Sequence, residues 1–460
     1  MRQHRLREGP ALRPARGLAF EWIRWRLYAV LSFSFLLGFF YRMAPGVVAG
    51  TLMKAFDASG VALGVLVATY FYVYTAMQMP AGILADTVGP RLSAGVGALL
   101  AGAGSIVFGL AQTFAAAATG RFLMGLGAST IFIGLLKINT TWFRPERHGA
   151  ANGLSMFVGN LGSVLAAGPF AVVLLWLSWR TVFAGAGVLS LVLGLFTLAY
   201  VRDRPEHAGF DPAAGESHAY AMPVAHWGRD LLAVLRNRQV WAGLCAQFGL
   251  GGSFFGFVGL WGVPLMHQGF GLSRTRASLY PTAAMAGLAV GALLAGWLSD
   301  RVGRRKPFMI GGPLITGFLW LVFLLAPWSP GWQGLSLCGL IGLIGSGTSV
   351  AYAAASETVP PRQAGMAMAA VNTGLFLGVA VAQPVLGWLL DLGWTGRMAE
   401  GARFYSLADY RHALWFSFAL VMLSLIASAF IRETYCRNLV GRAPPDSRHR
   451  DEACTLVSDR

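Results

Sequence analysis

The sequence predicts an all-α membrane protein in which twelve transmembrane helices form two pseudo-symmetric six-helix bundles. Two observations predict this fold: twelve long apolar stretches, and a motif that recurs at corresponding positions in the two halves of the chain. Of the 460 residues, 55% are hydrophobic and only 12% are charged. Soluble domains are about a quarter charged, and a soluble protein of this composition would expose large apolar patches. We therefore expect a lipid bilayer to surround most of the chain.

Each apolar stretch is long enough to cross a membrane, which takes about 20 residues as a helix. Helices are required because every backbone polar group in the bilayer must be paired within its own segment, unless a closed barrel forms. The stretches do not alternate as barrel strands do. The predicted spans are 27–48, 61–83, 92–113, 115–141, 150–176, 181–201, 239–266, 277–299, 307–326, 334–357, 364–389 and 412–431.

These spans divide the chain into an N-terminal segment (1–26), an N-terminal bundle (27–201), a linker (202–238), a C-terminal bundle (239–431) and a tail (432–460). The first apolar run is too long for a typical signal peptide, so we expect an uncleaved span.

The basic residues predict the orientation of the spans. Most of the 36 basic residues fall on one side of the membrane if the N-terminus lies inside the cell. The positive-inside rule then predicts that both termini are cytoplasmic. This topology also explains the net charge of +16 without nucleic acid as a partner. We expect a multi-pass protein of a cell membrane, with a bacterial inner membrane as the favoured location.

The sequence contains no pattern typical of a metal site, a cofactor site or an enzyme. Its four cysteines, Cys245, Cys338, Cys436 and Cys454, have neither paired nor zinc-binding spacing. No predicted span carries a catalytic triad or a zinc-protease helix. We therefore expect a non-enzyme without a metal or cofactor.

A repeated motif relates the two halves. GILADTVG begins at Gly82 and GWLSDRVG begins at Gly296, and each follows the second predicted span of its half. The glycines and aspartates of the two copies share one spacing. Two similar six-span halves are typical of carriers whose binding site lies between them.

This loop resembles the motif of the major facilitator superfamily, Gly-x-x-x-Asp-(Arg)-x-Gly-(Arg)-(Arg/Lys). The first copy departs from it at Thr87 and Pro90. The resemblance implies a conformational latch in which Asp86 contacts the start of the eleventh span, with Arg144 or Arg147 as partners; solvated loop charges are the alternative. The proposed latch residues are Gly82, Asp86, Gly89, Arg91, Arg144, Arg147, Gly296, Asp300, Arg301, Gly303 and Arg304.

A closer resemblance is to the organic-anion carriers of that superfamily, the anion:cation symporters. The segments FFYRMAPG, YFYVYTAMQMPAGILAD and GRFLMGLGAS carry it. The first places Arg42 in span one and the third places Arg121 in span four. The resemblance implies that both arginines bind the carboxylate of the substrate.

The residues support this role independently. An arginine inside a span is costly and usually faces an aqueous cavity. Arg42 and Arg121 each lie about six residues, or roughly 9 Å, from the outer end of their span, so both sit at a similar depth. Two guanidinium groups at one level can hold a carboxylate, phosphate or sulfonate bidentately. The alternatives are snorkelling to the surface and bracing of helices.

Tyr70, Tyr74 and Gln78 recur every four residues and therefore share one helix face. That face either lines the binding site or packs against another helix. Lys137, Asn160 and Asn372 are weaker candidates for substrate contacts. Lys137 lies near the cytoplasmic end of its span, where it can snorkel, and polar residues such as the two asparagines also join membrane helices.

All acidic residues fall in loops, in tails or at span ends. The related symporters commonly carry an acid beside the arginine of span one, whereas Tyr41 and Met43 flank Arg42 here. Proton coupling through that residue is therefore not expected. A proton carried on the substrate and exchange for a counter-anion both remain open.

We expect a monomeric secondary transporter that moves a small organic anion by alternating access. A multidrug or metabolite exporter is the alternative within the superfamily, because Gly168-Pro169 matches part of an exporter motif. A cavity with cations and no carboxylate would repel the hydrophobic cations that such exporters carry. The alternative of another class is a carrier-like membrane sensor that does not transport.

Overall fold

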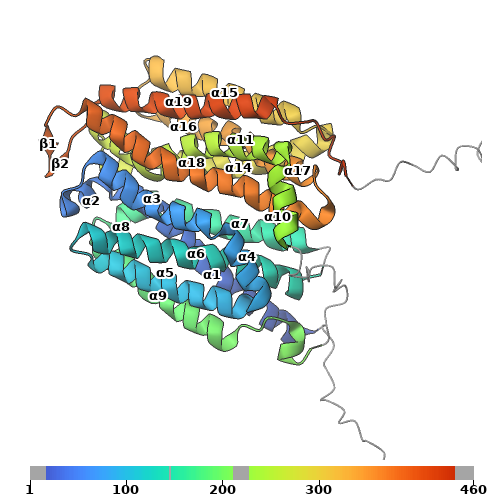
Figure 1. The fold of residues 1–460 in the computed structure, drawn as a ribbon. Helices are drawn as coiled ribbons and strands as arrows, with labels where there is room; N and C mark the ends of the chain where they lie inside the picture. Colours follow the sequence, from blue (N-terminus) through green and yellow to red (C-terminus); the bar gives the residue numbers. More distant parts are fainter. Residues whose placement is uncertain (1–16, 145–146, 211–226, 441–460) are drawn as a thin grey trace, which may run out of the picture.

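The computed structural model describes residues 17–144, 147–210 and 227–440. Within these ranges a few side chains fall outside the description: those of Asp86, Trp227, Thr348, Ser349 and Arg362. Eleven of the described helices are long and apolar enough to cross a membrane, or twelve if the bent pair α2 and α3 counts as one. The helices run nearly parallel along one axis (Figure 1). This is the predicted twelve-helix membrane fold.

The N-terminal half contains nine helices within the described residues. They are α1 (Leu18–Val47), α2 (Ala49–Phe56), α3 (Gly60–Ala76), α4 (Gln78–Thr87), α5 (Pro90–Leu110), α6 (Phe114–Trp142), α7 (His148–Leu165), α8 (Gly168–Val173) and α9 (Trp179–Tyr200). Helix α3 continues into α4 after Met77, whose backbone is nearly helical, and these two helices cover the predicted second span.

The linker contains the short 3-10 helix η2 (Pro205–Ala208) and α10 (Trp227–Arg236). The C-terminal half contains long helices and several short irregular turns. Its elements are α11 (Arg238–Gly256), the π-helix η5 (Phe257–Trp261), α12 (Gly262–Pro264), the π-helix η6 (Leu265–Gly269), α13 (Arg274–Ala277), α14 (Leu279–Val302), α15 (Lys306–Leu325), α16 (Trp332–Gly345), η7 (Ser346–Ser349), α17 (Val350–Ser356), η8 (Pro361–Gln363), α18 (Ala364–Gly393), β1 (Met398–Ala399), β2 (Ala402–Arg403) and α19 (Leu407–Ala429).

The two ends of the bundle differ. We call the end where α1 begins and α19 ends the terminal end, and the other the hairpin end, because the antiparallel strands β1 and β2 lie there (Figure 1). Five helices that start at the hairpin end are capped by a Ser or Thr hydroxyl, which accepts a hydrogen bond from a backbone N–H group of the first turn. The caps are Ser59, Thr113, Ser178, Ser273 and Ser406.

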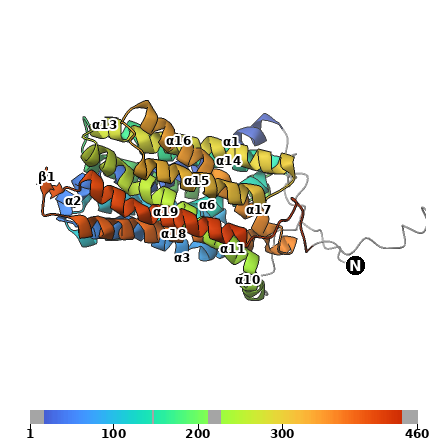
Figure 2. The same cartoon turned by 90° about the horizontal axis from the view of Figure 1, so that it is seen from above.

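The two halves meet along α3 and α18, which lie side by side in both views (Figures 1 and 2). One apolar core crosses between the halves from the middle of the bundle to the hairpin end, and it includes Leu52, Leu63, Leu260 and Leu386. At the terminal end each half has its own separate core. The halves are therefore joined at the hairpin end and packed independently at the terminal end.

The first helix begins at Leu18, inside the segment 1–26 that the sequence placed before the first span. The reason is that its polar residues are paired within the helix. Arg24 is buried and forms an ion pair with Glu21. Its guanidinium carbon lies 4.7 Å from the ring centroid of Phe143. Pairing of this kind makes the burial of a charge tolerable.

The linker helix α10 runs across the direction of the spans at the terminal end (Figure 1). Its Val234 is fully buried, whereas Leu232 and Leu235 are exposed. The Nε2 atom of Gln363 donates a 2.6 Å hydrogen bond to Asp230. The linker is thus attached to the C-terminal half at the start of α18.

Candidate functional site

Arg42 on α1 lies at the boundary between the two halves. Only 6% of the residue is exposed. Its guanidinium carbon lies 4.5 Å from the ring centroid of Phe39, 4.9 Å from that of Tyr74 and 4.7 Å from that of Phe376 on α18 of the other half. Its Nε atom is buried and has no hydrogen-bond partner among the described residues. The cation is therefore held by aromatic faces, which attract it electrostatically.

Arg121 on α6 lies close by and is fully buried. Its Nη1 atom donates to the carbonyl of Tyr41 at 2.5 Å and its Nη2 atom donates to the carbonyl of Val67 at 2.8 Å. These bonds tie α6 to α1 and α3, which is the helix-bracing alternative considered above. They use only part of the five donors of a guanidinium, and its Nε atom has no hydrogen-bond partner in the part of the chain that the structure describes.

A tyrosine ring connects the two arginines. The centroid of Tyr70 lies 5.8 Å from the guanidinium carbon of Arg42 and 5.0 Å from that of Arg121. Its hydroxyl donates to the carbonyl of Gly38 at 3.1 Å, and its ring stacks on that of Tyr74. Neither arginine forms an ion pair with any residue that the structure describes. The structure thus brings four of the predicted binding residues together.

A second polar group spans the boundary next to this cluster. The Nδ2 atom of Asn372 on α18 donates to Oε1 of Gln78 on α4 at 3.2 Å, and the hydroxyl of Tyr352 donates to Oδ1 of Asn372 at 3.0 Å. Two predicted residues from different halves therefore contact each other. Tyr352 on α17 was missed by sequence reasoning.

Lys137 on α6 and Asn160 on α7 are half-buried. The carbonyl of Lys137 accepts hydrogen bonds from the hydroxyls of Thr140 and Thr141 one turn later. These contacts lie within α6. They give no direct support to a substrate contact for either residue.

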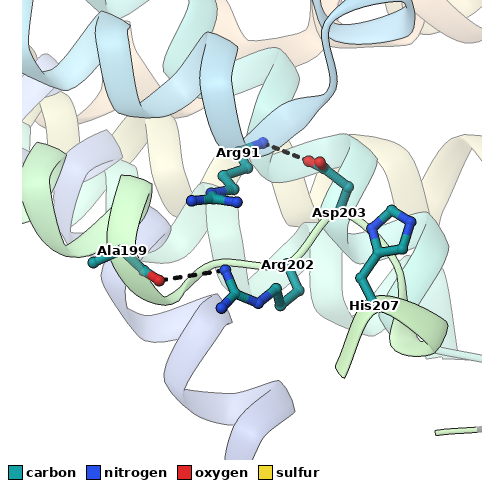
Figure 3. A pocket seen from close by; sticks show the side chains of 5 residues that line it. All are labelled: Arg91, Ala199, Arg202, Asp203 and His207. Atoms are coloured by element: carbon teal, nitrogen blue, oxygen red, sulfur yellow. Dashed lines mark hydrogen bonds between the residues drawn. The ribbon is translucent and has the colours of Figure 1, made fainter. Parts of the chain in front are cut away.

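The first copy of the loop motif contacts its own half. A cavity of about 460 Å³ at the terminal end is lined by Arg91, Ala199, Arg202, Asp203 and His207 (Figure 3). The backbone N–H of Arg91 donates to Asp203 at 2.7 Å, which caps the start of α5, and its guanidinium donates to the carbonyl of Leu198. Arg91 is therefore engaged with the α9 end of the N-terminal half.

The other predicted latch residues of the N-terminal half differ in their surroundings. Gly89 has a φ of 89° and lies against Asp203, so it combines a left-handed turn with a close approach. Gly82 faces open space. Arg144 and Arg147 are exposed. The side chain of Asp86 lies outside the description, so its contact with span eleven stays a prediction.

The second copy organises the terminal end of the C-terminal half around Arg305. Its Nη1 atom donates to Asp300 at 2.6 Å and its Nη2 atom to Glu357 at 2.9 Å. Burial opposes the charged form of Arg305, but the hydrogen bonds to Glu357 and Asp300 outweigh it and raise its pKa. The carboxylate of Glu433 accepts from the backbone N–H groups of Arg305 and Lys306 at 2.8 Å and 3.0 Å. This network joins α14, α15, the end of α17 and the segment after α19.

Four other predicted latch residues belong to this second copy. Gly303 ends α14 with a φ of 70°. The guanidinium carbon of Arg301 lies 5.2 Å from the ring centroid of Trp297, the Arg304 side chain is exposed, and Gly296 faces open space. Asp300 contacts Arg305 within its own half. The motif holds each half together in this conformation.

Sequence reasoning missed Phe376, Tyr352 and Arg305 as site residues. Arg305 had a signal, because it belongs to the second motif copy. Phe376 lies one turn after the predicted Asn372 on the same helix, which is also a usable signal. Among the described residues, no group of three or more His, Cys, Asp or Glu side chains is placed to hold a metal ion.

Comparison with known proteins gives consistent matches along the chain. The sequence model of the Major Facilitator Superfamily matches residues 30–263 and 260–452. The membrane sensor protein UhpC of Escherichia coli (strain K12) is 27% identical, over 81% of this chain and 86% of the sensor. The probable sulfoacetate transporter SauU of Cupriavidus necator is 22% identical, over 80% of this chain and 87% of the transporter.

The fold is also similar to solved transporter structures. A bacterial homologue of the human lysosomal transporter spinster, in an inward-facing and unoccupied conformation, superposes with a TM-score of 0.69. The two share 20% sequence identity over 92% of this chain and 99% of the other. At this identity the similarity concerns the fold.

Proposed function

The chain belongs to the Major Facilitator Superfamily, and from this premise we propose that it moves a small organic anion across a membrane by alternating access. The anion is a carboxylate, or a phosphate or sulfonate of similar size. Its binding residues are Arg42 and Arg121, with Tyr70 and Tyr74 beside them.

One observation carries this proposal: Arg42 is buried at the boundary of the halves without an acidic partner among the described residues. A buried charge is costly unless it is paired. Aromatic faces offset part of that cost, by about 0.5–2 kcal/mol each. An anionic ligand supplies the missing partner, and its charge-assisted hydrogen bonds to a guanidinium are among the strong ones in proteins.

Arg121 supports the site in a different way. Its hydrogen bonds to the carbonyls of Tyr41 and Val67 hold α1 and α3 in register with α6. Carbonyl partners do not neutralise its charge. Arg121 therefore adds its charge to the positive potential of the cluster. This potential favours anions over cations.

The packing of the two halves supports alternating access. A shared core at the hairpin end and separate cores at the terminal end suit a carrier that is closed at one end and ready to separate at the other. We propose that the terminal end is cytoplasmic, in line with the distribution of basic residues. The described state is then closed toward the outside. Gln78, Asn372 and Tyr352 are contacts that separate when the terminal end opens.

The sulfoacetate transporter supports an anionic substrate class, since the molecule in its name carries a carboxylate and a sulfonate. We propose a monomer in a bacterial inner membrane with both termini in the cytoplasm. Either a proton or a counter-anion is the coupling partner.

Uptake into proteoliposomes tests the proposal. Purified protein is reconstituted and offered labelled carboxylates, phosphates and sulfonates, with and without a proton gradient. Replacing Arg42 with Gln should lower uptake of the transported anion roughly 10-fold or more, because a charged hydrogen bond is lost. Arg121→Gln should also lower it.

Arg26→Gln is the matched control, because Arg26 lies on the same helix but is exposed and stacks on Trp22 near the terminal end. It should transport as the wild type does. Full uptake by both Arg42→Gln and Arg121→Gln, with normal insertion, would remove the site assignment.

A membrane sensor is the second candidate, because a relative that is 27% identical is named as one. A sensor binds its ligand without net flux. Saturable anion binding in detergent together with the absence of both uptake and counterflow in liposomes would favour that function.

A further inference from the structure

The seam between α3 and α18 is unusually tight at the hairpin end. A Cβ atom added at Gly60 would lie 2.7 Å from the carbonyl oxygen of Gly387, and one at Gly64 would lie 2.5 Å from that of Gln383. Glycine is required at such positions because the backbones themselves are in contact. Nearby, the cavity between α1 and α12 has a volume of only about 30 Å³. The hairpin end is thus closed by backbone contact.

A carboxylate joins the two halves at this seam. Asp391 lies in the last turn of α18, and its Oδ1 and Oδ2 atoms accept hydrogen bonds from the backbone N–H groups of Gly60 at 2.9 Å and Val61 at 2.8 Å. These are the first two N–H groups of α3, which have no partner within their own helix. The next one, of Ala62, donates to the Ser59 cap. A residue of the C-terminal half therefore completes the cap of a helix in the N-terminal half.

Two further donors hold the same carboxylate from its own half. The hydroxyl of Tyr405 donates to Oδ1 of Asp391 at 2.6 Å, and Nη1 of Arg403 donates to it at 3.0 Å. Burial and the hydrogen bond to Asp391 raise the pKa of Tyr405, so its hydroxyl remains a donor. Arg403 is stacked on Trp394, with its guanidinium carbon 4.1 Å from the ring centroid. These two donors therefore fix the orientation of the carboxylate independently of its contact with α3.

We propose that Asp391 is a latch that stabilises the state closed at the hairpin end, by capping the N-terminus of α3 across the boundary of the halves. A negative charge is favourable at a helix N-terminus, where the helix dipole and the free N–H groups point toward it. The two donors of its own half keep Asp391 oriented in either state. Only the bonds to Gly60 and Val61 must break when this end opens.

This latch is the counterpart of the one expected from the sequence. Helices α3 and α4 run antiparallel to α18. The resemblance to the superfamily places Asp86 at the end of this second span against the start of α18, at the terminal end. Asp391 stands at the end of α18 against the start of α3, at the hairpin end. The contact predicted for Asp86 and the contact made by Asp391 would together place one capping aspartate at each end of the molecule.

The inference rests on the proposed alternating access, but it is tested without substrate. Spin labels at Ala115→Cys on α6 and Ala408→Cys on α19, in a background without native cysteines, report the distance between the halves at the hairpin end. Both residues are exposed. In nanodiscs, Asp391→Asn should shift the distribution toward longer distances, with the closed-to-open ratio falling roughly 10-fold, since a charge-assisted hydrogen bond commonly exceeds the free energy of a tenfold change.

Asp409→Asn is the matched control, because Asp409 is an aspartate at the same end whose hydrogen bonds to Ser406 stay within the C-terminal half. It should leave the distance distribution unchanged. Tyr405→Phe removes one donor and keeps the carboxylate, so it should produce a smaller shift and also serves if Asp391→Asn fails to fold.

Unchanged distances in both Asp391→Asn and Tyr405→Phe would overturn the latch, as would an equal shift in Asp409→Asn. Because no anion is present, a shift with no anion uptake by the wild type would keep the latch and reject only the proposed function.

Discussion

Arg42 is held by rings rather than by charges. Phe39 and Tyr74 come from its own half and Phe376 comes from the other, so the environment of the cation is complete only when the halves are together. In the proposed alternating access, opening at the terminal end changes this environment. A residue at the boundary of two moving bodies is well placed to couple ligand binding to their motion, because the ligand contacts differ between the states.

Glu433 offers a residue-level test of stability. Burial favours its neutral form, but hydrogen bonds from backbone N–H groups, including those of Arg305 and Lys306, outweigh burial and lower the pKa of Glu433. A lowered pKa stabilises the fold above the unfolded value of about 4.3, and this stabilisation is lost as the pH falls through the folded value.

Glu433→Gln should therefore lower the thermal unfolding midpoint at pH 7, and the difference from the wild type should shrink as the pH falls to about 4 and below. Thermal unfolding in detergent followed across this range checks it. A difference that grows on acidification would contradict the assignment.

At the scale of elements, glycines set the distance between neighbouring helices. A Cβ atom at Gly120 on α6 would lie 2.7 Å from the carbonyl oxygen of Gly104 on α5. Small residues allow this approach, which is the main source of helix association in a bilayer. Helices α5 and α6 thus form a closely packed pair, and α6 carries Arg121.

Gly120→Ala should destabilise the N-terminal half by about 1–3 kcal/mol, because a methyl group has no room there. Gly185→Ala on α9 is the control, since its Cβ would have nothing within 4 Å. Unfolding in denaturant compares the two. Equal stability of both variants would mean that the α5–α6 contact relaxes without cost.

At the scale of the whole molecule, the two ends should move in opposite directions. Labels at Ala150→Cys on α7 and Gly365→Cys on α18 mark the terminal end, and the Ala115/Ala408 pair marks the hairpin end; all four residues are exposed. In any condition that lengthens one distance, the other should shorten, because the halves rock about a central site. Distances measured by electron spin resonance with and without transported anion check this. Both distances lengthening together would indicate separation of the halves and contradict alternating access.

The sequence by itself determined the membrane fold, the two related halves and the position of Arg42 and Arg121 within spans. The length of the apolar stretches, the repeated motif spacing and the basic loops indicate how each segment lies in the bilayer. Each of these signals is contained within a short stretch of the chain. Gln78 and Asn372 were predicted separately as site residues, and in the structure they form a hydrogen bond with each other.

Only the tertiary structure decided which residues complete each site. The decisive contacts join segments that are distant in the chain. Phe376 lies against Arg42, and the carbonyls of Tyr41 and Val67 accept hydrogen bonds from Arg121. Asp391 accepts hydrogen bonds from the first turn of α3. Periodicity fixes which face of a helix is buried, but the rotation and neighbours of that helix follow from packing against the others. The sequence therefore indicated only that Asp391 lies at a span end. The fold shows that its carboxylate connects the two halves through hydrogen bonds to α3.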